Sequence, residues 1–254
     1  MAWTDREGNP VEVPEPPPSG SYYTEVGDFQ GAAYERNAFA LGTRQEVEFL
    51  WDALRLRPGE VLLDVGCGTG RHTRAFAERG LRSVGVDISP GLLRAAAAHG
   101  TTAAFVLADA RAIPLADAAV DAVVCLCQGG FGITPGGDRA ILREIARVLR
   151  PGGRLALTAF SLVFAARYLA PEDAIDTSRG LVWSPAEVRG ADDERRRFDL
   201  WTSCYSAGEL RDMLLTSGFD LESLSGVEPG AYGRHAPTIA APELLALAVR
   251  RPQL

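Results

Sequence analysis

The chain has 254 residues, of which 46% are hydrophobic, and a formal net charge of −7 at pH 7. This length fits one large domain, or one domain with a small cap, around a substantial core. The acidic balance disfavours a nucleic-acid partner, because nucleic-acid binders must neutralise phosphates. No apolar run of about 18 residues and no signal-peptide pattern is found, so we expect no membrane partner and a cytoplasmic location.

The first 57 residues are predicted to precede a core domain at 58–254. Residues 8–20 are rich in Pro and Gly, so residues 1–20 are interpreted as an arm that is disordered or laid over the surface. A first helix is expected at about 29–40, with Asp28 as its cap. A second helix is expected to open at Thr43, where Glu46 completes a capping box.

From Pro58 onward, short apolar strands alternate with helices. The strands are predicted at 61–66, 83–88, 103–109, 121–127 and 154–160, and the helices at 71–80, 89–100 and 138–150. Strands at this spacing imply right-handed crossovers and a parallel sheet covered on both faces. Ligands of such sheets bind beyond the carboxyl ends of the strands, so the loops after each strand carry the information about function.

The alternation stops after the fifth strand. Residues 161–204 are interpreted as a cap insertion above the active edge of the sheet, with a helical start and β segments at 181–183 and 197–205. A helix at 206–219 then leads into strands at 220–227 and 244–251. Because no helix separates these two strands, they are expected to pair antiparallel. The predicted fold class is a Rossmann-like, doubly wound α/β sheet of seven strands, mostly parallel with an antiparallel last strand.

The turn between the first strand and its helix holds three glycines, Gly66, Gly68 and Gly70, in the stretch VLLDVGCGTG. Glycine tolerates positive φ and lets another group approach the backbone, and a helix amino terminus attracts negative groups. The spacing departs from the dinucleotide fingerprint G-x-G-x-x-G, because Arg71 stands where the third glycine would be. An acid, Asp64, precedes the turn.

Four segments, in this order and spacing, resemble the class I S-adenosylmethionine-dependent methyltransferases. VLLDVGCGTG resembles the first motif of that family, VGVDIS at 84–89 the second, and VLADARAIPLADAAVDAVV the third with its following segment. LRPGGRLAL resembles the turn before the fifth strand. The resemblance covers about residues 58–160 and implies S-adenosylmethionine as cofactor and methyl transfer as the activity.

The resemblance also implies roles for individual residues. Asp87 would accept both ribose hydroxyls, Asp109 would accept from the adenine amino group, and Ala110 would offer its N–H. Ile88 would cover one face of the adenine, and Gly66 and Gly68 would let the methionine part lie against the backbone. Asp64 is expected to order the turn by accepting from backbone N–H groups, with direct ligand contact left open. The candidate cofactor-binding set is Asp64, Gly66, Cys67, Gly68, Gly70, Asp87, Ile88, Asp109, Ala110, Cys127, Gln128, Tyr23 and Tyr34.

The end of the fourth strand, CQGGFG, lacks the Asn/Asp-Pro-Pro-aromatic signature of relatives that methylate nucleic-acid bases or glutamine. This difference favours a small-molecule acceptor, with O, N or C as the methylated atom and natural-product biosynthesis as one setting. Two alternatives stay open: another reaction on the same cofactor, such as cyclisation or decarboxylation, and a cofactor-binding protein without turnover. The oligomeric state, monomer or homodimer, also stays open.

Histidines and aromatics supply the candidate catalytic and closing groups. His235, in the loop between the last two strands, is the preferred general base, whereas His72 is interpreted as exposed. Tyr23 and Tyr34 are expected to close over the cofactor, as part of an N-terminal helical lid like that of relatives. Cys125 and Cys127 lie two residues apart and on a strand would face the same side, but no further ligands lie near them, so no metal site is predicted.

Overall fold

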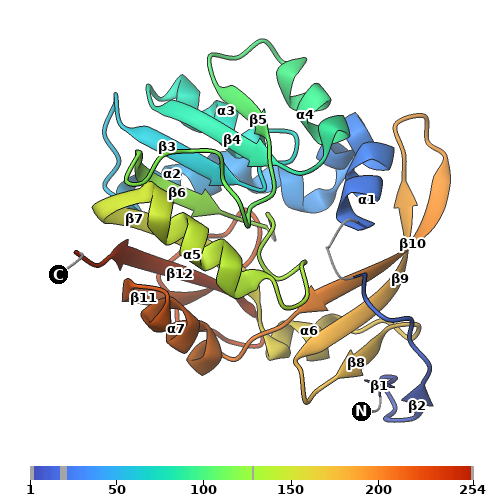
Figure 1. Ribbon diagram of the computed structural model, residues 1–254. Helices are drawn as coiled ribbons and strands as arrows, with labels where there is room; N and C mark the ends of the chain where they lie inside the picture. Colours follow the sequence, from blue (N-terminus) through green and yellow to red (C-terminus); the bar gives the residue numbers. More distant parts are fainter. Residues whose placement is uncertain (1–2, 18–21, 128, 253–254) are drawn as a thin grey trace.

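The computed structural model describes residues 3–17, 22–127 and 129–252. Its larger sheet has the strand order β11–β12–β7–β6–β3–β4–β5 (Figure 1). These strands are β3 (Val61–Val65), β4 (Arg82–Asp87), β5 (Ala104–Leu107), β6 (Val120–Cys125), β7 (Leu149–Phe160), β11 (Phe219–Val227) and β12 (Glu243–Arg250). Neighbours from β5 to β7 pair parallel, and β12 pairs antiparallel with both β7 and β11. The predicted fold class is confirmed.

Helices cover both faces of this sheet because successive strand residues point to opposite sides. Leu63 packs in a cluster with side chains of α5 (Asp138–Val148) and α7 (Ala207–Thr216). Its neighbour Leu62 packs in the other cluster, with α2 (Thr43–Ala53) and α3 (Arg71–Glu78). The crossover between β4 and β5 contains α4 (Pro90–Ala97). The carboxyl ends of the parallel strands are therefore left for a ligand.

A second sheet lies beside the first, with the order β10–β9–β8–β1–β2 (Figure 1). Its strands are β1 (Trp3–Thr4), β2 (Pro10–Val11), β8 (Ala174–Asp176), β9 (Leu181–Arg189) and β10 (Arg195–Ser203). In the insertion, α6 (Leu162–Tyr168) precedes β8. The β segment expected at 181–183 falls in β9, and the segment expected at 197–205 overlaps β10 up to Ser203. Within residues 3–17, the arm is laid over the surface rather than disordered, because β1 pairs with β8.

The first N-terminal helix differs from the prediction, whereas the second begins at Thr43 as predicted. The first, α1, spans Tyr22–Gln30, and two 3-10 helices follow, η1 (Gly31–Arg36) and η2 (Ala38–Gly42). Asp28 lies inside α1, where its Oδ1 accepts from Ser89 Oγ at 2.8 Å and from Gly91 N at 2.6 Å, so it caps α4. The predicted capping box at Thr43 is also wrong, because α2 has no side-chain cap and Glu46 is fully buried in contacts with other segments.

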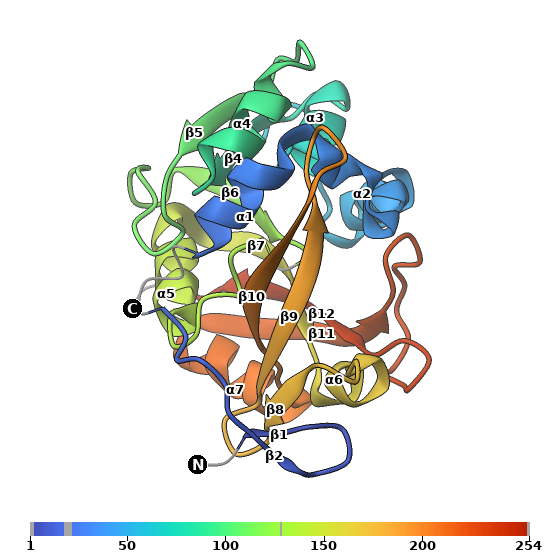
Figure 2. The same ribbon diagram turned by 90° about the vertical axis from the view of Figure 1, so that its right-hand side faces the viewer.

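The N-terminal helices and the insertion meet over the carboxyl edge of the larger sheet. Figure 2 shows the β9–β10 hairpin, in orange, running past α1, and α1 contacts β9, β10 and α4. Val26 of α1 packs with Val188 and Phe198 of the hairpin, and the rings of Phe29 and Phe198 lie 5.5 Å apart. Apolar burial of this kind stabilises by about 25 cal/mol per Å². The helix α1 and the β9–β10 hairpin, which are distant in sequence, therefore pack together and form one cover over this edge of the sheet.

Candidate active site

The glycine turn lies tightly against β4 and against the loop after β6. Gly66 N and Cys67 N both donate to the carbonyl of Val86, at 2.8 and 3.0 Å. At Gly66, where φ is +67°, an added Cβ would lie 1.9 Å from the carbonyl group of Gly129. At Gly68, where φ is +55°, the nearest neighbour of such a Cβ is the ring of Tyr34, at 3.7 Å. Gly66 therefore serves the close approach of two backbones, whereas Gly68 leaves room above the turn.

Asp87 ends β4 directly beside this turn and is buried. Its Oδ2 accepts from Gly68 N at 2.8 Å, and its Oδ1 accepts from Ser89 N at 2.8 Å. Burial raises the pKa of Asp87, while these backbone hydrogen bonds partly offset the effect. A carboxylate offers about four lone-pair sites, so acceptor capacity remains for a ligand.

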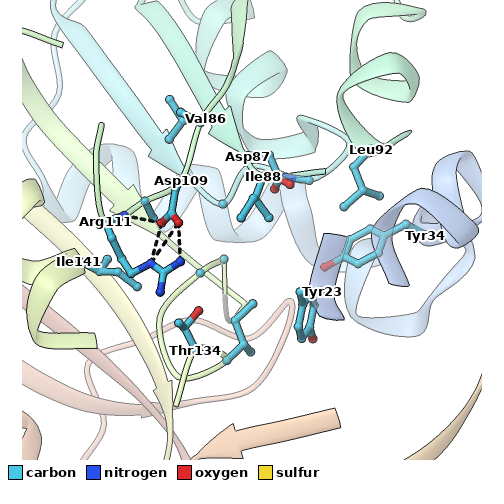
Figure 3. Close-up of a pocket in the computed structure, with 17 residues that line it drawn as sticks. Tyr23, Tyr34, Val86, Asp87, Ile88, Leu92, Asp109, Arg111, Thr134 and Ile141 are labelled. Atoms are coloured by element: carbon cyan, nitrogen blue, oxygen red, sulfur yellow. Dashed lines mark hydrogen bonds and ion pairs between the residues drawn. The ribbon is translucent and has the colours of Figure 1, made fainter. Parts of the chain in front are cut away.

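A cavity opens above Asp87 and the glycine turn (Figure 3). Figure 3 shows Asp109 and Arg111 on one side of it and Tyr23 and Tyr34 on the other. Eight residues of the predicted cofactor-binding set line this cavity: Tyr23, Tyr34, Gly66, Gly68, Asp87, Ile88, Asp109 and Ala110. The structure thus brings together residues from the N-terminal helices and from the ends of three strands.

Three predicted residues lie behind the cavity wall. Asp64 is buried and accepts from Thr73 Oγ1 at 2.6 Å, so it holds the first turn of α3 and not the N–H groups of the glycine turn. Burial raises its pKa. Cys67 is also buried, and Gly70, with φ +72°, precedes α3 and lies against the ring of Phe105. The prediction for Gln128 lies outside the described residues.

The sequence reasoning missed part of this cavity. Arg111 donates to both carboxylate oxygens of Asp109, at 2.6 to 3.1 Å, and this hydrogen bonding lowers the pKa of Asp109. The loop after β6 contributes Gly129, Gly130, Ile133 and Thr134. The glycines of CQGGFGIT were a visible signal for a ligand-facing loop after a strand. Arg111 carried no such signal beyond its place two residues after Asp109.

A second, larger cavity of about 500 Å³ adjoins the first, since Tyr23, Tyr34 and Ile133 line both. Cys127 lies on its wall. Its remaining lining comes mainly from α1, β7, α6, β9 and β10, with Glu243 from β12. It combines apolar or aromatic side chains with polar ones such as Gln30, Asn37 and Thr202. The cap, rather than the glycine turn, therefore shapes this second compartment.

Beneath this compartment lies a buried charge cluster. Glu46 Oε2 bonds to Arg71 Nη1 at 2.9 Å and to His72 Nε2 at 2.6 Å, and its Oε1 accepts from Gly230 N at 2.9 Å. Burial raises the pKa of Glu46, but the His72 hydrogen bond and the charges of His72 and Arg71 outweigh it and lower the pKa. The prediction that His72 is exposed is wrong, because Glu46 draws it into the interior.

The cluster also positions Cys127, whose Sγ accepts from Arg71 Nη2 at 3.0 Å. Burial raises the pKa of the Cys127 thiol to about 12, so it is a neutral group. Cys127 follows β6 with φ +51° and packs on the α2 side of the sheet, whereas Cys125 packs on the α5 side. The two cysteines therefore do not share a face, since the strand ends between them.

His235 is more exposed to solvent than Glu46, His72 and Cys127. It lies in the loop between β11 and β12, its side chain is exposed, and it is not among the lining residues of either cavity. Its carbonyl oxygen accepts from Gly226 N at 2.8 Å. The structure therefore does not place the predicted general base on the wall of either compartment.

Residues 62–153 match a family model described as a methyltransferase domain. The matched segment lies within the part of the chain that resembles the class I S-adenosylmethionine-dependent methyltransferases. A curated relative, the malonyl-[acyl-carrier protein] O-methyltransferase of Serratia marcescens, is 38% identical over 126 residues, 49% of this chain and 48% of the relative. The demethylmenaquinone methyltransferase of Beutenbergia cavernae is 40% identical over 110 residues, 43% of this chain and 45% of that protein. The chain thus aligns with about half the length of the curated relatives it matches.

A solved structure shares the fold over most of its length. The CcbJ methyltransferase from Streptomyces caelestis gives a TM-score of 0.72 at 18% identity, covering 89% of this chain and 98% of that one. At this identity the likeness concerns the fold alone. Within the described residues, no helix is long and apolar enough to cross a membrane.

Proposed function

We propose that this protein transfers a methyl group from S-adenosylmethionine to a small-molecule acceptor. The observation that carries the proposal is the buried Asp87 carboxylate at the end of β4, held by Gly68 N and Ser89 N and facing the cavity above the glycine turn. Its remaining acceptor capacity suits the paired hydroxyls of a ribose. The open space above Gly68 suits a ligand chain that lies against the backbone.

The other lining residues fit the remaining parts of the cofactor. Asp109 can accept from an adenine amino group, Ala110 can donate its N–H, and Ile88 can cover one ring face. Asp109 is also held by Arg111, so its carboxylate is fixed in place before a ligand arrives. The functions of these residues, and of the N-terminal lid that carries Tyr23 and Tyr34, are proposals.

When bound, S-adenosylmethionine supplies a methyl group that is already activated on a sulfonium. The protein therefore has to align an acceptor and keep water out. Tyr23, Tyr34 and Ile133 line both cavities and stand where the cofactor and acceptor compartments meet. Their aromatic and apolar surfaces exclude water there, and the aromatic faces favour a nearby positive charge.

Two observations support a small acceptor. The second cavity has the size of a typical small-molecule pocket and is largely enclosed by the cap. The chain is acidic, with a net charge of −7, which disfavours nucleic acid. The named curated relatives act on different acceptors, so the half that matches them does not fix the acceptor. The cytoplasmic location and the choice between monomer and homodimer stay predictions.

A calorimetric titration with S-adenosylhomocysteine tests the proposal. We expect binding to the wild-type chain, no comparable binding of NAD, and at least about 100-fold weaker S-adenosylhomocysteine binding by Asp87→Ala, because two charge-assisted hydrogen bonds are lost. The matched control is Asp52→Ala, which changes an acid of α2 outside both cavities. A folded wild-type protein that binds no S-adenosylhomocysteine would contradict the proposal.

A further inference from the structure

Three uncharged polar side chains line the second cavity. Gln30 is the last residue of α1, Asn37 lies between η1 and η2, and Thr202 belongs to β10. All three are half-buried, and none of them lines the first cavity. The N-terminal helices and the β9–β10 hairpin, which are distant in sequence, thus both contribute hydrogen-bonding groups to the proposed acceptor compartment.

Within the described residues, the side chains of Gln30, Asn37 and Thr202 make no hydrogen bond to the protein. Asn37 is the clearest case. It precedes η2 with the extended backbone of an N-cap, φ −68° and ψ 141°, where an Asn side chain usually accepts from the backbone, yet it makes no cap bond. Its carboxamide therefore keeps both donors and an acceptor for a molecule in the cavity.

The charged groups of this cavity have partners within the protein. Glu187 and Arg189 are more than half exposed, and they pair with Arg195 at 2.6 Å and with Asp193 at 3.4 Å. Glu243 also interacts with other groups of the protein. A charged ligand group placed here would lose its water without gaining a free counter-charge, and that loss is costly. The compartment therefore favours an uncharged ligand.

A pair of aromatic rings forms another part of the wall. Phe160 and Phe164 stack with ring centroids 3.8 Å apart and an interplanar angle of 9°. Both rings line the second cavity, and both line a smaller neighbouring cavity, as Thr202 also does. Flat aromatic surface packs well against another aromatic ring. A planar ring that carries polar substituents therefore matches both the rings and the uncharged polar groups of this wall.

We propose that the acceptor is an uncharged aromatic molecule whose hydroxyl or carboxamide groups bond to Gln30, Asn37 and Thr202. This inference rests on the proposed function and names its substrate class. A ligand without such groups would leave these side chains unpaired against its surface, which costs binding free energy. Because Gln30 and Asn37 belong to the N-terminal helices and Thr202 to the hairpin, an acceptor that bonds to both also holds the two segments together.

Three naphthalene derivatives of similar size test the proposal. At neutral pH, 2-naphthamide is uncharged, 2-naphthoate is negative and 2-naphthylmethylamine is positive. Each is titrated by NMR into the full-length protein, with and without saturating S-adenosylhomocysteine. The variants are Asn37→Leu, Gln30→Leu and their double variant, which remove the carboxamides and keep a similar volume, and Thr202→Val, which removes the hydroxyl. Asn9→Leu, at an exposed position of the N-terminal arm, is the matched control.

We expect the wild type to bind 2-naphthamide at least about tenfold more tightly than either charged probe, because neither finds a free counter-charge. Asn37→Leu and Gln30→Leu should each weaken 2-naphthamide binding about fivefold, and Thr202→Val about twofold, whereas Asn9→Leu should leave it unchanged. Tighter or equal binding of a charged probe by the wild type would overturn the proposal. Undetectable binding of all three probes, or unchanged 2-naphthamide binding in the folded double variant, would overturn it as well.

Titration of the same variants with S-adenosylhomocysteine separates this proposal from the proposed function. None of the three residues lines the first cavity, so each variant should bind S-adenosylhomocysteine as the wild type does. A wild-type protein that binds no S-adenosylhomocysteine would contradict the proposed function, whereas the probe titrations without S-adenosylhomocysteine would still report on the second cavity.

Discussion

The two compartments of the site are built in opposite ways. The wall with Asp87 and Asp109 uses the ends of adjacent parallel strands, β4 and β5, and the turn after β3. The wall of the larger cavity joins α1, near the start of the chain, to β9, β10 and β12. The difference teaches that local strand–turn–helix chemistry sets the cofactor wall, whereas long-range packing sets the acceptor wall. Four substitutions test this division, from the largest expected effect to the smallest.

Gly66→Ala should break the cofactor wall. The added Cβ would lie 1.9 Å from the Gly129 carbonyl group at a φ of +67°, so two backbone segments must separate. We expect a loss of more than about 4 kcal/mol in the free energy of unfolding, measured by urea denaturation. Gly68→Ala is the matched control: it should cost about 1–2 kcal/mol in backbone strain but strongly weaken S-adenosylhomocysteine binding. Equal stability of the two variants would contradict the distinct roles of the two glycines.

Glu46→Gln should weaken the junction between the two walls. Glu46 connects α2 to Arg71 and His72 of α3 and to Gly230 near the C-terminus, and the substitution leaves Arg71 buried without its counter-charge. We expect a loss of roughly 3–5 kcal/mol in the free energy of unfolding, measured in urea. Glu48→Gln, at an exposed position of the same helix, should change it by less than about 0.5 kcal/mol. If Glu46→Gln lowered the free energy of unfolding as little as Glu48→Gln does, the cluster would have no structural role.

Asp138→Asn should remove a pH dependence at the junction of cap and core. Tyr205 donates to Asp138 Oδ2, and Gly132 N donates to its Oδ1 at 2.8 Å. Burial raises the pKa of Asp138 to about 6 from 3.8, and the hydrogen bonds act against this shift. Its contribution to stability is complete below about pH 3.8 and is lost as the pH rises through about 6.

The expected size of this effect is about 2–3 kcal/mol between pH 4 and pH 7.5. It is measured by urea denaturation at a series of pH values, as the difference between wild type and Asp138→Asn. That difference should favour the variant more as the pH rises. Parallel pH profiles for the two proteins would show that Asp138 does not titrate in this window.

Asp109→Ala should change the cofactor wall least. Asp109 is about one-third exposed and already paired with Arg111, so a ligand gains less from it than from the buried Asp87. We expect S-adenosylhomocysteine binding to weaken about tenfold, which corresponds to ~1.4 kcal/mol, in calorimetry. Arg111→Ala should weaken it less, because Asp109 keeps its acceptor oxygens. If Asp109→Ala weakened S-adenosylhomocysteine binding more than Asp87→Ala does, the expectation that Asp87 contributes more to binding would be contradicted.

Sequence patterns predicted the cofactor wall because its determinants are short-range. Gly66, Gly68 and Asp87 follow apolar strands directly, and the carboxyl ends of parallel strands meet at one edge. The residues in the interior of the site are harder to predict from the sequence. Glu46 read as a capping-box residue because its partners Arg71 and His72 lie 25 and 26 positions away. Glu243 carried no signal, because only the pairing of β12 with β7 shows that it faces the cavity.

The same limit explains the misplaced helix and the choice of base. Asp28 was a reasonable cap for its own segment, but tertiary contacts give its carboxylate to α4. His235 was favoured because its loop follows a strand end, yet its side chain is exposed and lines neither cavity. Periodicity and motifs locate elements, while the direction of a side chain in a loop depends on packing that the local sequence does not encode.

Hydrogen–deuterium exchange of the full-length chain, with and without S-adenosylhomocysteine, tests the central claim most directly. The account predicts slower exchange at residues 66–70 and 108–111, and in the α1 and η1 segment that carries Tyr23 and Tyr34. The outer strands β1, β2 and β8 should exchange at unchanged rates. Protection confined to those outer strands, or no protection at the glycine turn at saturating ligand, would contradict the assignment of the site.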